Sequence, residues 1–123
     1  MPIWIWISAF GVLGVLCRYG MDQYFSQASL NFPVSTFIIN IVGSFLAGLV
    51  FVLAEKQQLS SQWSVVLLVG FCGGFTTFSA FALQMFQMID KGRLAPALAY
   101  VTLSPALGLL AALIPIFLLR RWV

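Results

Sequence analysis

The sequence contains no histidine and few charged residues. Its 123 residues include six Lys and Arg and three Asp and Glu, so that 7% are charged, whereas a soluble domain carries about 25%. Without histidine it lacks the commonest metal ligand and a common general base. The net charge of +3 is too small and too scattered to indicate nucleic acid as a partner. We therefore expect neither catalysis nor nucleic-acid binding.

Cysteine is also scarce. Cys17 and Cys72 both lie in apolar runs, and their spacing fits no metal-binding signature. We expect two packed thiols rather than a disulfide.

What the sequence does contain is long apolar segments. It is 62% hydrophobic, with a mean hydropathy of +1.05, and crossing a bilayer takes about 20 apolar residues in a helix. Four segments qualify, at about residues 3–25, 33–54, 63–89 and 94–119. The sequence predicts an all-α membrane protein, surrounded by lipid, in which residues 1–123 form a single domain of four transmembrane helices.

The third segment contains residues that disfavour a continuous helix. The run from Gly70 to Phe81 includes adjacent glycines, adjacent threonines and a serine, and each glycine costs a helix about 1 kcal/mol relative to alanine. In lipid, any backbone group released by a break needs a partner inside the protein or in a water-filled cavity. We predict that the third helix is broken near its middle.

The positive charges divide almost evenly between the two sides of the membrane. One side carries Lys56, Arg120 and Arg121, and the other carries Lys91, Arg93 and, if it reaches the interface, Arg18. The Lys and Arg bias that normally sets orientation is therefore nearly absent. This favours insertion in both orientations and a dimer of antiparallel copies. The alternative, that a lipid-facing charge or the insertion machinery selects one orientation, stays open.

Several polar and aromatic residues lie inside the apolar segments. A buried amide such as Asn40 needs a partner, so it either joins helices or lines an ion path. Tyr100 and Ser104 share one helix face, although Ser104 has the alternative of bonding to its own helix. Phe78 and Phe81 also share a face, as part of the core or of a path.

Arg18 and Asp22 are four residues apart near the end of the first segment. Two interpretations remain open here. They form an intrahelical ion pair that lowers the cost of a charge near lipid, or Arg18 makes an electropositive vestibule that attracts anions.

The interiors of the last three segments contain no Asp, Glu, Lys, Arg or His. Proton-coupled pumps and cation exporters usually place an ionisable group at such positions. The groups that are present, amide and hydroxyl donors and the positive edges of Phe rings, suit a small anion.

The run Gly73 to Phe81, which reads GGFTTFSAF, closely resembles the GG-x-TTFSTF signature of the Fluc (CrcB) family of fluoride channels. The length and the four segments also match this family, as do Arg18, Asn40, Tyr100 and Ser104. Ala80 stands where the family has Thr.

The resemblance implies a passive, fluoride-selective channel that exports fluoride from the cytoplasm, located in the bacterial inner membrane as an antiparallel, dual-topology homodimer. It implies a vestibule at Arg18 and a structural Na+ at the dimer interface, held by the backbone carbonyls of Gly73 and Thr76. The residues that it assigns to the fluoride pore are Asn40, Phe78, Ser79, Phe81, Tyr100 and Ser104.

Two other classes of function remain as alternatives. Small multidrug-type exporters are also four-helix, dual-topology proteins, but they rely on a membrane-embedded Glu, and Glu55 lies at the end of a segment here. The other alternative is a non-transporting membrane scaffold subunit, whose polar residues only join helices.

Overall fold

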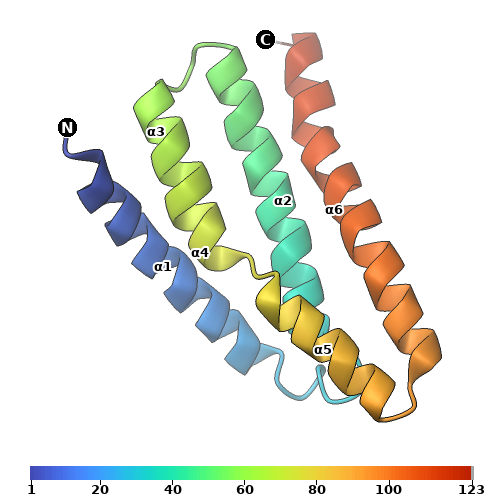
Figure 1. Cartoon of the computed structure of the whole chain (residues 1–123). Coiled ribbons are helices and arrows are strands. Elements are labelled where there is room, and N and C mark those ends of the chain that lie inside the picture. Colours follow the sequence, from blue (N-terminus) through green and yellow to red (C-terminus); the bar gives the residue numbers. More distant parts are fainter. Residues whose placement is uncertain (123) are drawn as a thin grey trace.

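The computed structural model describes residues 1–122, which form helices joined by short turns (Figure 1). Val123, the last residue of the predicted single domain, lies outside the described residues. The elements are α1 (Ile3–Tyr24), α2 (Val34–Glu55), α3 (Ser61–Val65), the π-helix η1 (Val66–Cys72), α4 (Gly73–Phe75), α5 (Ser79–Asp90) and α6 (Leu94–Trp122).

Four helical segments are long and apolar enough to cross a membrane. They are Ile3–Tyr24, Val34–Glu55, Ser61–Asp90 and Leu94–Arg121, and the third combines α3, η1, α4 and α5. No strand occurs in residues 1–122. The predicted all-helical architecture with four candidate spans is therefore confirmed. Figure 1 shows that α1 begins at the same end of the molecule at which α6 ends.

Local sequence sets several helix ends. Ser60 precedes α3, and its side-chain oxygen accepts a hydrogen bond from the Trp63 N–H at 3.3 Å, which satisfies one of the unpaired donors of the first turn. The turn between α5 and α6 contains Gly92 at φ 74°, a left-handed conformation that costs glycine little. Such short turns keep successive spans antiparallel.

Glycines allow the helices to approach closely. Gly11 and Gly14 of α1 lie against the backbone of the third span near Gly74, and Gly48 of α2 lies against the backbone of Ala112 in α6. In lipid the hydrophobic effect does not drive helices together, so association depends on such close contacts between small residues. As a result α1 packs on η1 and α4, and α2 packs on α6.

The outer surface is strongly apolar. Exposed fractions reach 69% at Trp4, 61% at Leu16, 62% at Leu109 and 65% at Phe117. Water would penalise so much exposed apolar surface, whereas the acyl chains of a bilayer do not.

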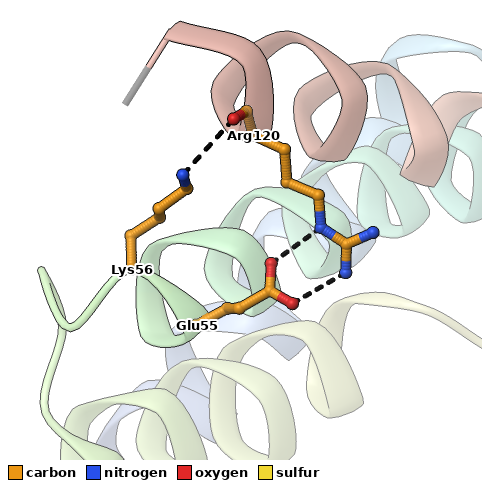
Figure 2. Close-up of polar contacts among 3 residues, drawn as sticks. All are labelled: Glu55, Lys56 and Arg120. Atoms are coloured by element: carbon orange, nitrogen blue, oxygen red, sulfur yellow. Dashed lines mark hydrogen bonds and ion pairs between the residues drawn. The ribbon is translucent and has the colours of Figure 1, made fainter.

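The ends of α2 and α6 are joined by charged residues. The Arg120 guanidinium donates from two nitrogens to the two carboxylate oxygens of Glu55, each at 2.8 Å, and Lys56 Nζ donates to the Arg120 carbonyl at 3.3 Å (Figure 2). The side chains of Arg120 and Glu55 are 48% and 40% exposed, so solvent weakens the pair. We interpret this ion pair as a polar contact that joins the ends of α2 and α6 at the surface.

Candidate functional site

The centre of the third span is a short non-helical segment. The helix α4 ends at Phe75, and Thr76 has an extended backbone with φ −81° and ψ 159°. Helical structure resumes at Ser79, the first residue of α5. Thr76, Thr77 and Phe78 therefore lie in no helix, and Figure 1 shows them as the connection between α4 and α5.

The hydrogen bonds of this segment differ from those of a continuous helix. In such a helix the N–H groups of Thr77 and Ala80 would donate to the carbonyls of Gly73 and Thr76, four residues earlier. Here the Thr77 N–H donates to Asn40 Oδ1 at 2.9 Å, and the Ala80 N–H donates to Thr77 Oγ1 at 3.3 Å. The carbonyl oxygens of Gly73 and Thr76 thereby lose their usual helical donors.

Asn40 connects α2 to this segment through both ends of its amide. Its Oδ1 accepts from the Thr77 N–H, and its Nδ2 donates to the Thr77 carbonyl at 3.1 Å. A side-chain amide nitrogen carries two hydrogens, so one N–H remains after this bond. Asn40 thus joins α2 to the non-helical segment and keeps one donor for another partner.

A cavity of about 600 Å³ lies beside the segment, between α2, the third span and α6. Four of the predicted pore residues and both residues of the predicted carbonyl site line it: Asn40, Gly73, Thr76, Phe78, Phe81 and Ser104. Its lining contains no Asp, Glu, Lys or Arg among the residues that the structure describes. The structure therefore brings residues from three spans together around one uncharged space.

Ser104 supplies an unused donor to this cavity. The residue is 8% exposed, and its hydroxyl is the one buried side-chain polar atom without a hydrogen-bond partner in the described part of the chain. The bond from Ser104 to its own helix, which the sequence admits, is not formed. Because an unsatisfied buried polar group costs about 1–3 kcal/mol, this hydroxyl is well suited to a ligand in the cavity.

The two phenylalanines of the signature run have different surroundings. Phe78 is 79% exposed in the single chain. Phe81 packs against the buried cluster around Tyr100, with ring centroids 4.7 Å apart and an interplanar angle of 62°. The centroids of Phe78 and Phe81 are 6.1 Å apart. The pair therefore extends from the core to the open side of the cavity.

Tyr100 and Ser79 lie outside the lining of this cavity. Tyr100 is fully buried, and its hydroxyl donates to Gln84 Oε1 at 2.8 Å. Ser79 is exposed at the start of α5. Of the six predicted pore residues, these two do not face the 600 Å³ space.

Thr36 and Gln84 continue the hydrogen bonding from Tyr100 and were not identified as site residues from the sequence. Gln84 Nε2 donates to Thr36 Oγ1 at 2.9 Å, and both residues line a second cavity, of about 250 Å³. Gln84 follows Phe81 by three residues and so shares its helix face. A polar residue on the same helix face as Phe81 was the sequence signal that could have identified Gln84.

Arg18 and Asp22 do not form the ion pair that the sequence admits. Within residues 1–122 neither the Arg18 nor the Asp22 side chain takes part in a salt bridge. Arg18 Nε instead donates to the Gly74 carbonyl at 3.2 Å, and Asp22 accepts a hydrogen bond from the Ser35 hydroxyl. Each side chain therefore contacts a different element, because α1 packs beside the third span on one side and reaches the start of α2 on the other.

Comparison with known proteins gives consistent matches over most of the chain. Residues 5–116 match the family described as CrcB-like protein, Camphor Resistance (CrcB). A fluoride-specific ion channel of Saccharophagus degradans is 35% identical over 122 residues, which cover 98% of this chain and 92% of the relative.

Two further relatives carry the same kind of name. A fluoride-specific ion channel of Bifidobacterium longum is 42% identical over 106 residues, covering 83% of this chain and 85% of the relative. Another, from Renibacterium salmoninarum, is 36% identical over 115 residues, covering 88% of this chain and 91% of the relative. The relatives are named as ion channels, which are not enzymes. With four helices able to cross a membrane, this chain belongs to the CrcB-like family of multi-pass membrane proteins.

Proposed function

We propose that this chain forms a passive, fluoride-selective channel that lets fluoride leave the cytoplasm through the bacterial inner membrane. The relatives' names support the choice of ion. The observation that carries the proposal is the uncharged 600 Å³ cavity, which is lined by Asn40, whose amide keeps one N–H unused, and by Ser104, whose hydroxyl has no partner. Neutral donors replace the water of a small anion without holding it as tightly as a fixed cation would.

In this proposal the phenylalanines provide the walls of the path. The edge of a Phe ring carries partial positive charge, so Phe78 and Phe81 attract the ion without a formal charge. Tyr100 contributes indirectly through its contact with Phe81, and Ser79 adds a hydroxyl at the exposed start of α5.

We further propose that the channel is an antiparallel homodimer. The cavity is open to the outside of the single chain, and 79% of Phe78 is exposed there. Asn40 and Thr77, which are both partly exposed, also line this cavity, and polar groups at membrane depth must not face lipid. A second copy that covers this face would keep these polar groups away from lipid. The nearly even division of Lys and Arg supports opposite orientations of the two copies.

The same segment suits a structural Na+ between the two copies. The carbonyls of Gly73 and Thr76 have lost their helical donors, and both residues line the open cavity. Gly73 has no side chain to keep an ion or a second backbone away. Hard cations prefer oxygen ligands, so the Gly73 and Thr76 carbonyls of both copies would hold the ion. Bound Na+ would supply a fixed positive charge that joins the two copies.

A flux measurement tests the proposed path. We expect that Phe78→Ile and Phe81→Ile each reduce fluoride efflux from proteoliposomes to near the background rate, because an aliphatic side chain has no positive ring edge. Efflux is measured with a fluoride electrode, and chloride serves as the control ion. The matched control is Phe86→Ile, which lies on α5 as Phe81 does and is 62% exposed, and it should leave the flux unchanged.

Two results would contradict the proposal. Wild-type efflux from both Phe78→Ile and Phe81→Ile would exclude the ring-edge path. A wild-type protein that forms a dimer but passes no fluoride would favour the scaffold alternative.

Glu55 separates a channel from a multidrug-type exporter. Its carboxylate is engaged by Arg120 at the end of α2 (Figure 2) and does not line the 600 Å³ cavity. We expect Glu55→Gln to leave fluoride efflux unchanged and expect the flux to be independent of an imposed proton gradient. An exporter that used Glu55 for coupling would lose transport in this variant, and its flux would follow the proton gradient.

A further inference from the structure

The Arg18 side chain ends at Gly74 in α4, just before the non-helical segment of the third span. Its Nε donates to the Gly74 carbonyl at 3.2 Å, in a half-buried position 56 residues away in the sequence. In a continuous helix this carbonyl would accept a hydrogen bond from the Phe78 N–H. Phe78 belongs to the segment that leaves the helical path, so the Arg18 guanidinium occupies the place of the missing donor.

The close packing of α1 against the third span supports the contact between Arg18 and Gly74. Gly14, one turn before Arg18, is buried against the backbone of Phe71, Gly74 and Phe75. Gly74 in turn lies against the carbonyl of Gly11, 2.5 Å from where a Cβ on Gly74 would be. These contacts place the backbone of α1 close to α4. Arg18, one turn beyond Gly14, therefore lies beside the end of α4.

Asn40 holds the same junction from another helix. It bonds to both backbone groups of Thr77 from α2, whereas Arg18 bonds to Gly74 from α1. The junction between α4 and α5 is thus bonded to α1 at Gly74 and to α2 at Thr77. The carbonyl of Gly74 is engaged, while those of Gly73 and Thr76 keep no helical donor.

We propose that Arg18 is a positioning residue that caps the carboxyl end of α4 and holds the junction between α4 and α5 in place. Its positive charge favours this position because the end of a helix carries partial negative charge on its free carbonyls. This role differs from that of a free vestibule cation, which acts on the ion at a distance and needs no contact with Gly74. The consequence of the cap for fluoride flux rests on the proposed function, whereas the contact itself does not.

Selective isotope labelling can observe the Gly74 carbonyl directly. With 13C at glycine carbonyls and 15N at phenylalanine, a spectrum filtered for bonded carbon–nitrogen pairs contains only the Gly70–Phe71 and Gly74–Phe75 peptides. We expect Arg18→Gln to move the Gly74 carbonyl signal upfield, because the carbonyl loses a charged donor. The Gly70 signal, an internal control, should stay in place. Arg121→Gln, which removes the same charge at the far end of α6, should move neither.

A Gly74 signal that keeps its wild-type position in Arg18→Gln would overturn the proposal. If that variant does not fold, the wild-type protein in bilayers still tests it: 15N in the arginine guanidinium should dephase the Gly74 carbonyl signal through their short distance. Absence of this dephasing would also overturn it.

Flux provides a second readout. A positioning role predicts that the loss of fluoride efflux in Arg18→Gln persists at high ionic strength, whereas the effect of a distant attracting charge is screened by salt. Efflux of Arg18→Gln that equals the wild type at high salt would contradict the positioning role. Because the labelling experiment needs no transport, an Arg18-dependent Gly74 signal in a protein that passes no fluoride would contradict only the proposed function.

Discussion

Replacing Asn40 with aspartate should abolish fluoride flux and also loosen the junction between α4 and α5. A carboxylate cannot donate to the Thr77 carbonyl as Asn40 Nδ2 does. This carbonyl is partly buried, and leaving it unpaired costs up to about 1–3 kcal/mol. The charge also faces the 600 Å³ cavity, where it repels an anion. Efflux measured with a fluoride electrode should fall to background, and the thermal unfolding temperature in detergent should decrease.

Two further variants separate these effects. Asn40→Ala removes the bridge to Thr77 without adding a charge, so it should lower stability and retain more flux than Asn40→Asp. Asn31→Asp makes the same chemical change in an exposed loop, where Asn31 Oδ1 already acts as an acceptor for Arg93, and should behave like the wild type. Wild-type flux in Asn40→Asp would remove Asn40 from the ion path.

Replacing Gly14 with alanine should destabilise the protein strongly. An added Cβ would overlap the Phe71 carbonyl oxygen, and it would lie 2.9 Å from the Phe75 nitrogen and 3.2 Å from the Gly74 carbonyl carbon. All three are backbone atoms, which cannot rotate away as a side chain can. Overpacking of this kind costs about 1–3 kcal/mol, and here it also displaces α1 from the third span.

Gly20→Ala in the same helix is the matched control, since no atom lies within 4 Å of its added Cβ. The substitution replaces glycine with a better helix former, worth up to about 1 kcal/mol, so its effect should have the opposite sign. Unfolding in detergent, followed by circular dichroism, measures both variants. Equal effects of Gly14→Ala and Gly20→Ala would contradict the close approach of α1 to α4.

Sequence reasoning located much of the candidate site but not how its parts are connected. The family resemblance assigned Asn40, Phe78, Phe81 and Ser104 to the pore, whereas residue type and helical register left other roles open, and all four line one cavity. The resemblance also assigned Tyr100 to the pore, and the structure buries it against Gln84. Register shows which side chains share a helix face, but not which neighbouring helix covers that face.

The Arg18 prediction shows the same limit. A spacing of four residues made Asp22 a plausible partner, yet each side chain found a partner on another element. Local spacing describes one helix in isolation, whereas the tightly packed seam between α1 and the third span brought the Gly74 carbonyl within reach of Arg18.

The sequence alone determined that the chain is helical and has four segments able to cross a membrane. The thickness of the hydrocarbon core sets how many apolar residues a spanning helix needs. Segments of that length with almost no charge are suited to lipid, where only a helix satisfies every backbone group. Only the tertiary structure decided which donor meets each backbone group at the junction of α4 and α5. These bonds join residues 37 and 56 positions apart, and such distant partners are selected by helix packing, which no local pattern encodes.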